Sequence, residues 1–233
     1  MPWLPLILIY GLIGFKIGGL KLSLTIVASF LFITFTGVLP QALLSIYLCG
    51  IAVIISFILG SSLGIWAAHN DKVSAFMRPI NDTMQTMPSF VILIPFVMFF
   101  GIGEFTALLA IIAYAFVPAM RYTEHGLRNL PETVIEAARM IGCSQTQLLW
   151  KVKIPLAMPV IMLGLNQTIM FGLAMLVIAA LVGTTGLGQL IYIGLSKADF
   201  GTGMISGVSI ALIAIIFDRT TQAWRIKLEK KTQ

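Results

Sequence analysis

Few residues of this chain have the types and spacing that catalysis or metal binding requires. The two histidines, His69 and His125, are far apart in the sequence and have no metal-ligand spacing around them. The chain has no G-x-x-x-x-G-K-S/T phosphate-binding loop, and no Ser/His/Asp or Cys/His set can be assembled from it. We therefore expect no catalytic residue, no metal site and no cofactor in this chain, and we do not expect an enzyme.

The acidic residues lie in polar stretches or at the ends of apolar ones. They are Asp71, Asp82, Glu104, Glu124, Glu132, Glu136, Asp199, Asp218 and Glu229. Carriers coupled to protons or sodium usually place ionisable residues inside the bilayer. A charge there costs free energy, so such residues usually have a function in ion binding or transfer. This distribution disfavours an ion-coupled carrier.

One apolar stretch, 158–182, does contain a polar cluster. Asn166, Gln167 and Thr168 follow one another early in this stretch. Buried polar side chains in lipid usually face a bundle interior or a cavity, so these residues and Met170 are candidates to line a pathway. Hydrogen bonds between helices explain the polar cluster equally well, and core packing explains Met170 better.

The longest polar stretch, 121–157, begins with signals for a short helix. Asn129 can cap this helix, with Pro131 in its first turn and Glu132 placed to return the capping bond. Gly142 is the expected end, because glycine readily adopts the left-handed conformation that terminates helices.

A second short helix is expected directly after that glycine. Ser144 and Gln147 form a capping box that starts it, and we expect Pro155 to end it and turn the chain back to the membrane. The product is helix, glycine turn, helix. A connecting loop that happens to be helical would look similar, but a loop of this length with its own start and stop signals is more often functional.

Membrane-spanning helices must position these features. The chain has 233 residues, 58% hydrophobic and 10% charged, whereas soluble domains carry about 25% charged residues. The apolar segments are 3–15, 22–39, 42–68, 88–102, 105–120, 158–182 and 203–218. A hydrocarbon core of about 30 Å needs roughly 20 apolar helical residues, so several segments are short. We expect an all-α integral membrane protein with about seven (six to seven) transmembrane helices.

The basic residues predict the orientation of this bundle. With seven crossings, all of the 15 Lys and Arg residues except Lys197 fall on one set of loops. Such loops stay in the cytoplasm, which places the N-terminus outside, the C-terminus inside and 121–157 inside. The net charge of +6 needs no nucleic acid, since the basic tail can contact anionic lipid headgroups.

The second half of the polar stretch resembles the EAA signature of permease subunits of ATP-binding cassette (ABC) importers. Residues 136–138 are Glu-Ala-Ala, Gly142 follows at the expected spacing, and 152–155 supply the aliphatic-x-aliphatic-Pro end. The resemblance implies a cytoplasmic helix–turn–helix coupling segment that sits in a groove of a separate ATPase. It assigns ATPase coupling to Glu136, Ala137, Ala138, Arg139, Gly142 and Pro155.

Further motifs are similar to glycine betaine/proline betaine permeases. They lie at 64–66, 85–90, 94–95, 100–103, 156–159, 166–170 and 186–189. The likeness covers about 42–222, which we take as the permease core with its coupling segment at 129–157. We assign 1–41 to two N-terminal spans, of which the first is short, and 223–233 to a basic cytoplasmic tail.

The resemblance implies a multi-pass protein of the bacterial cytoplasmic (inner) membrane. Its partners would be two ATPase subunits that hold the ATP and Mg, a second permease copy or a sister permease, an extracytoplasmic substrate-binding protein and membrane lipid. The implied cargo is a quaternary ammonium solute of the glycine betaine, proline betaine or choline type. The alternative functions are the permease of an importer for another small polar solute, a scaffold subunit of a different membrane complex, and a channel.

Overall fold

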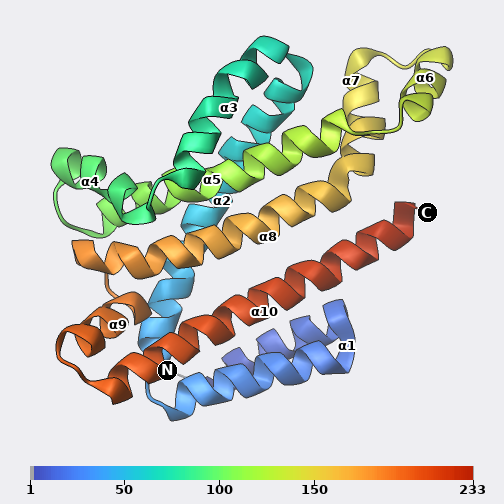
Figure 1. Ribbon diagram of the computed structural model, residues 1–233. Coiled ribbons are helices and arrows are strands. Elements are labelled where there is room, and N and C mark those ends of the chain that lie inside the picture. The colour runs from blue at the N-terminus through green and yellow to red at the C-terminus, as the bar shows by residue number, and fades with distance from the viewer. Residues whose placement is uncertain (1–2, 233) are drawn as a thin grey trace.

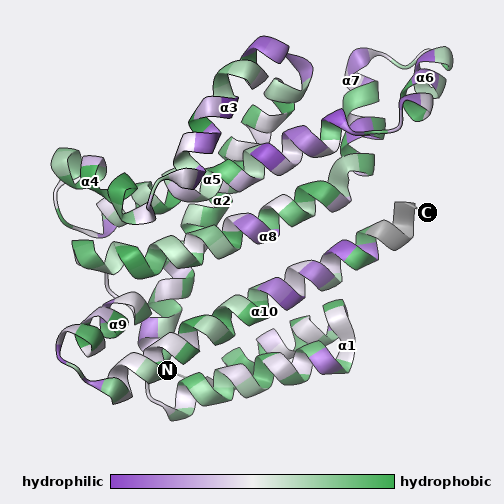
Figure 2. Ribbon diagram, viewed as in Figure 1, coloured by the Kyte–Doolittle hydropathy of each residue, from purple (hydrophilic) through white to green (hydrophobic). Residues whose placement is uncertain are grey.

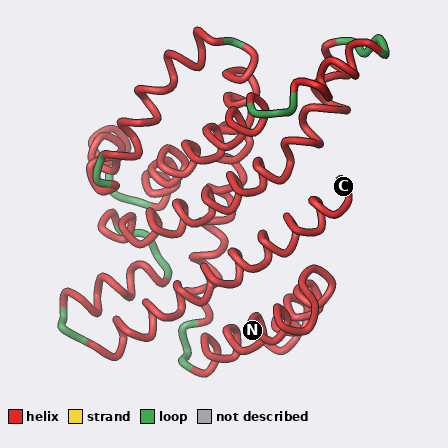
Figure 3. Tube along the Cα trace, turned by 45° about the vertical axis from the view of Figure 1, so that its right-hand side comes forward, coloured by secondary structure: helices red, strands yellow, loops and turns green. Residues whose placement is uncertain are grey.

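The computed structural model of the protein describes residues 3–232, and this part of the chain is almost entirely helical (Figure 1, Figure 3). Its elements are α1 (Trp3–Phe35), α2 (Leu39–His69), α3 (Asp71–Thr86), α4 (Ser89–Phe100), α5 (Glu104–Arg128), α6 (Glu132–Met140), α7 (Gln145–Gln147), η1 (Leu148–Lys153), α8 (Ile154–Ala179), η2 (Ala180–Val182), α9 (Leu187–Ser196) and α10 (Phe200–Thr232). None of the described residues lies in a β-strand. The predicted all-α class is confirmed.

The predicted spans 3–15 and 22–39 form the two arms of one bent helix, α1. The bend is at Gly19, whose φ of 75° is readily adopted only by glycine. The two arms fold back on each other, and the Ser23 hydroxyl of the second arm donates to the Gly11 carbonyl of the first at 2.9 Å. A straight helix of this length would extend about 50 Å; the bend packs the two arms side by side instead (Figure 1).

The predicted span 88–102 is also part of a broken element. Here α4 is only 12 residues long, and it follows α3 across a bend of 103°. Five described helices are long and apolar enough to cross a membrane, and α3 with α4 makes a sixth if they count as one broken span. The described residues therefore contain five to six candidate membrane spans. The count reaches the predicted seven when the two arms of α1 are counted as separate spans.

The centre of the bundle is made by α2, α5 and α8, which approach closely through small residues. A Cβ at Gly60 would lie 2.5 Å from the Phe116 carbonyl oxygen, and one at Gly64 would lie 2.6 Å from the Met120 carbonyl oxygen. Helices in lipid associate by this close backbone approach, since burial from water offers them no driving force. These contacts make α2 and α5 one rigid pair.

Polar residues concentrate at one end of the bundle (Figure 2). This end carries the α2–α3 junction, α6, α7 and the C-terminal part of α10, whereas α4 and α9 lie at the opposite end (Figure 1). The arrangement agrees with the uneven distribution of basic residues in the sequence. We call it the polar end below.

Candidate functional site

The first helix of the predicted coupling segment begins later than expected. Asn129 does not cap it: the Asn129 N–H bonds the His125 carbonyl at 3.1 Å and its side-chain amide donates to the same oxygen at 2.9 Å. Asn129 therefore closes α5, and α6 starts at Glu132 after Pro131, without a side-chain cap. Pro131, predicted to lie in the first turn, is instead the residue directly before the helix, where its ψ of 123° is extended and its lack of an N–H leaves no donor to satisfy.

The predicted glycine turn is confirmed at Gly142, which has a φ of 88°. The Gly142 N–H bonds the Arg139 carbonyl at 2.9 Å, and the Cys143 N–H bonds the Ala138 carbonyl at 3.2 Å. These two bonds define a Schellman motif, which satisfies the last carbonyls of a helix and needs a left-handed residue at this position. A side chain at Gly142 would strain this turn.

The second helix starts as predicted but does not end as predicted. Its capping box is confirmed, with the Gln147 N–H bonded to the Ser144 hydroxyl at 3.3 Å and the Ser144 N–H bonded to the Gln147 side chain at 3.0 Å. Pro155 does not end the helix, which continues without interruption to Val182.

A π-helical turn explains why the helix passes through Pro155. Proline has no N–H to donate and its ring clashes with the preceding turn of a regular α-helix. Leu148–Lys153 widens into a π-helix, where the Ile154 N–H bonds the Leu149 carbonyl five residues earlier. Wider turns of this kind absorb such a mismatch. The second helix of the coupling segment is thus continuous with the membrane helix α8.

Residues 136–142, which we call the coupling tip, are largely uncovered. Ala138 is its buried member, while Glu136, Ala137 and Arg139 are exposed. Met140 and Ile141 are 89% and 84% exposed. The tip lies outside the bundle at the polar end (Figure 1). Two fully exposed apolar side chains beyond the lipid-facing helices are typical of a surface that meets another protein.

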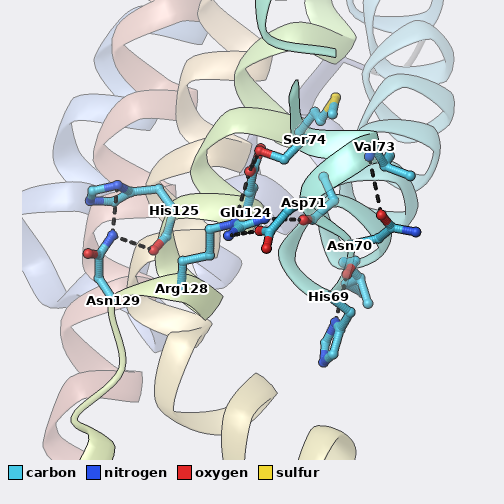
Figure 4. A network of polar contacts seen from close by, with 12 residues as sticks. His69, Asn70, Asp71, Val73, Ser74, Glu124, His125, Arg128 and Asn129 are labelled. Carbon is cyan, nitrogen blue, oxygen red and sulfur yellow. Dashed lines mark hydrogen bonds and ion pairs between the residues drawn. The ribbon is translucent and has the colours of Figure 1, made fainter. Parts of the chain in front are cut away.

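At the end of α5, a group of polar contacts ties three helices together (Figure 4). The Arg128 guanidinium contacts Glu124 at 3.0 Å, Asp71 at 2.8 Å and the Ala67 carbonyl at 2.7 Å. The Ser74 hydroxyl donates to the same Glu124 oxygen at 2.5 Å. We call these five residues the Arg128 clamp. It joins the end of α2 and the start of α3 to the last turn of α5.

The members of the Arg128 clamp differ in burial. Ser74 is 1% exposed, and the side chains of Glu124 and Arg128 are 12% and 29% exposed, whereas that of Asp71 is 92% exposed. A carboxylate as covered as Glu124 needs its two donors to offset lost hydration. The four-residue spacing of Glu124 and Arg128 on one helix predicts the ion pair between them, but it does not predict their contacts with α2 and α3.

The predicted pathway residues differ in their burial and in their hydrogen-bond partners. Asn166 is buried, and its amide donates to Asp218 at 2.9 Å while accepting from the Thr221 hydroxyl at 2.7 Å. These bonds join α8 to α10, which favours interhelical bonding over pathway lining for this residue. Asp218 lies well inside the continuous helix α10, although its place in the sequence suggested the end of a span.

The other pathway candidates show no contact that assigns them a role. Thr168 is buried and its hydroxyl donates to the Gly164 carbonyl at 2.8 Å, within its own helix. Gln167 and Met170 are half-buried. Their place in a pathway stays a prediction.

Two acidic residues at the opposite end of the bundle stabilise local structure. Glu104 accepts a hydrogen bond from the Thr185 hydroxyl at 2.5 Å. Asp199 accepts from the Thr202 hydroxyl at 2.7 Å and from the Thr202 N–H at 3.2 Å. The hydrogen bonds from Thr202 lower the pKa of Asp199 from its usual value.

The described residues form an all-helical bundle with long apolar helices and an exposed, glycine-terminated helix at its polar end, as expected of an integral membrane protein. Residues 57–224 match the family described as "Binding-protein-dependent transport system inner membrane component", and the chain belongs to this family. It is 40% identical over 223 residues to the glycine betaine/proline betaine transport system permease protein ProW of Escherichia coli (strain K12), covering 96% of this chain and 63% of that protein.

Two other relatives cover nearly the whole chain. The glycine betaine transport system permease protein OpuAB of Bacillus subtilis (strain 168) is 37% identical over 100% of this chain and 82% of its own length. The trimethylamine N-oxide transport system permease protein TmoV of Pelagibacter ubique (strain HTCC1062) is 42% identical over 97% of this chain. The chain spans 31% of the length of TmoV, so it corresponds to a part of that protein.

Solved structures share the fold. An inward-facing MetNI methionine ABC transporter chain matches with a TM-score of 0.73 at 19% identity, over 79% of this chain and 93% of the other. A chain of an amino acid ABC transporter with histidines matches with a TM-score of 0.69 at 17% identity, over 84% and 98%. The helical arrangement is therefore that of ABC transporter membrane subunits.

Proposed function

We propose that this chain is the permease subunit of an ATP-driven importer for a small quaternary ammonium or related dipolar solute. In this proposal the chain forms the transmembrane pathway and has no ATP site of its own. ATP and Mg bind to two separate ATPase subunits in the cytoplasm, and an extracytoplasmic binding protein delivers the solute. A second permease copy, identical or related, completes the pathway.

The exposure of the coupling tip is the observation that carries this proposal. Met140 and Ile141 are uncovered at the polar end, next to the Glu-Ala-Ala sequence at 136–138. The rigid turn at Gly142 fixes the direction of this helix, which suits insertion into a groove of a partner. Membership in a family of transport system membrane components supports an ATPase as that partner.

The route from the tip into the membrane has two parts. The continuous helix from Gln145 to Val182 links the tip to α8. The Arg128 clamp links the last turn of α5 to α2 and α3. When the ATPase pair closes and displaces the tip, both connections move helices that pack together in the bundle core. An alternating transporter needs such a bistable, rigidly connected element.

The cargo class rests on relatives. ProW and OpuAB are named for glycine betaine, and TmoV is named for trimethylamine N-oxide. Both named solutes carry a positive nitrogen with methyl groups and a negative oxygen in the same molecule, so they are dipolar and neutral overall. The acidic residues lie in polar stretches or at the ends of the apolar segments of the sequence, and few fixed charges within the spans suit such a solute, since a charge buried in lipid is costly.

The proposed orientation places the polar end in the cytoplasm. That end holds the coupling tip, the bend of α1 and the C-terminal part of α10 (Figure 1). The excess of Lys and Arg there supports this assignment, with the N-terminus outside and the C-terminus inside.

The test is reconstitution with the native partners. The chain is purified from its own membrane, its co-purifying proteins are identified, and the complex is reconstituted in proteoliposomes. We expect an ATPase to co-purify and ATP to drive uptake of labelled glycine betaine. Uptake of a different solute only would overturn the cargo class. Flux without nucleotide would favour a channel, and a complex without an ATPase would favour a scaffold subunit.

A further inference from the structure

A groove opens at the polar end between the bend of α1 and the C-terminal half of α10. It has a volume of about 480 Å³ and is lined on one side by Lys21 and on the other by Arg219. The groove is stably framed: a Cβ at Gly18 would lie 3.2 Å from Ala223, and the Lys227 ammonium donates to the Lys16 carbonyl at 2.7 Å. The bend of α1 and the C-terminal half of α10 are therefore in direct contact beside the groove.

The two cations that line the groove have no acidic partner among the described residues. None of the ion pairs in that part of the chain involves Lys21 or Arg219. The neighbouring carboxylate, Asp218, accepts hydrogen bonds from Asn166 at 2.9 Å and from the Gln222 amide at 2.7 and 2.8 Å, so it is engaged elsewhere. Lys21 and Arg219 are therefore both exposed and available to pair with an external anion.

The rest of the groove is partly apolar. Leu22, Ile215 and Ile226 line it together with the hydroxyl of Thr25. A site for a free inorganic anion would be polar on every side. A groove that is basic at its rim and aliphatic along its walls fits a molecule with a negative headgroup and a hydrocarbon chain.

We propose that this groove binds the headgroup of an anionic phospholipid, with the phosphate between Lys21 and Arg219 and an acyl chain along the aliphatic wall. The position at the bend of α1 places the phosphate at the level where apolar helices end and polar residues begin. Arg219 can contact two phosphate oxygens at once, and the Lys21 ammonium adds a flexible point charge.

The test uses native mass spectrometry of the full chain, delipidated in detergent and then mixed with phosphatidylglycerol or phosphatidylcholine. The wild type should retain phosphatidylglycerol in preference to phosphatidylcholine. The variant Lys21→Gln with Arg219→Gln should bind phosphatidylglycerol about thirtyfold more weakly, since each basic residue at an anionic surface contributes about a factor of five. Exchanging the two cations, Lys21→Arg with Arg219→Lys, should preserve binding.

The matched control removes two exposed basic residues of α3 at the same end, through Lys72→Gln and Arg78→Gln. It should leave phosphatidylglycerol retention unchanged. Equal loss in this control would show a general charge effect and overturn the site. Equal retention of both lipids by the wild type, or displacement of the lipid by inorganic phosphate, would also overturn it. Because the readout is lipid binding, its failure is separate from failure of the proposed transport function.

Discussion

The coupling tip and the Arg128 clamp are close neighbours in the sequence, yet they are built in opposite ways. In the tip, Met140 and Ile141 are almost fully exposed and contact little of their own chain. In the clamp, Glu124 is largely covered, and its Oε1 accepts hydrogen bonds from Ser74 and Arg128 of the same chain. The tip leaves apolar side chains uncovered for the proposed partner, whereas the polar groups of the clamp bond within the chain.

This difference separates two kinds of defect. Changes in the tip should disturb association with the partner and leave the bundle stable, because the tip contributes little to the core. Changes in the clamp should lower the stability of the α2–α3–α5 junction while leaving the docking surface present. The four predictions below run from the largest expected effect to the smallest.

The largest effect is expected from Gly142→Val in the tip. A β-branched residue at a φ of 88° strains the turn by about 1–3 kcal/mol, equivalent to roughly tenfold to hundredfold in its population. ATP-driven uptake should fall by at least about tenfold, measured in proteoliposomes alongside co-purification of the ATPase. Gly50→Ala is the control, since a Cβ at Gly50 meets nothing within 4 Å. Wild-type uptake by Gly142→Val would contradict the role of the turn.

The next effect is expected from Arg128→Gln in the clamp. It leaves Glu124 covered with one strong donor fewer, so the free energy of unfolding should fall by about 1–3 kcal/mol. The ATPase should still co-purify, in contrast to the tip variant. Arg121→Gln is the matched control, because the ion pair of Arg121 with Asp82 is 3.3 Å long and exposed. If Arg128→Gln lost the ATPase and kept its thermal stability, the clamp would act in docking as the tip does, which would contradict the proposed difference between the two regions.

A smaller effect is expected from Asn166→Leu, between α8 and α10. This change removes the bonds to Asp218 and Thr221, and interhelical hydrogen bonds in membranes contribute about 0.6 kcal/mol on average. Thermal stability should fall slightly, and the apparent KM for uptake should stay as it is. A severalfold change in KM without a change in stability would instead place Asn166 in the pathway.

The smallest effect is expected from Asp71→Asn at the exposed edge of the clamp. Its ion pair with Arg128 is 2.8 Å long, but the Asp71 side chain is solvent-accessible, so the loss should be about 0.2–1 kcal/mol. Unfolding measured in high salt should show no difference from the wild type, because salt screens exposed pairs. A loss as large as that of Arg128→Gln would mean that Asp71, rather than Glu124, carries the clamp.

Local signals predicted local structure well. The long apolar segments, the capping box at Ser144 and the left-handed turn at Gly142 depend on a few adjacent residues, and the structure contains each of them. The predicted helix end at Pro155 was wrong. The helix can continue through this proline because the preceding turn widens into a π-helix, and hydrophobic periodicity does not reveal such a turn.

Contacts between distant segments were beyond the sequence alone. The clamp joins Asp71 and Ser74 to Glu124 and Arg128 across about fifty residues, and no spacing rule connects them. The fold-back of α1 at Gly19 was likewise hidden, because two short apolar arms look like two spans. Tertiary packing decided both.

The most direct measurement of the central claim is the accessibility of Ile141 with and without the ATPase partner. Ile141→Cys is introduced in a Cys143→Ala background, in which the one other remaining cysteine, Cys49, is buried, and the purified protein is labelled with a membrane-impermeant maleimide. We expect rapid labelling of the cysteine in the chain alone, since Ile141 is 84% exposed. We expect the bound ATPase to protect this cysteine strongly from labelling. Unchanged labelling in a complex that retains the ATPase would contradict docking at the coupling tip.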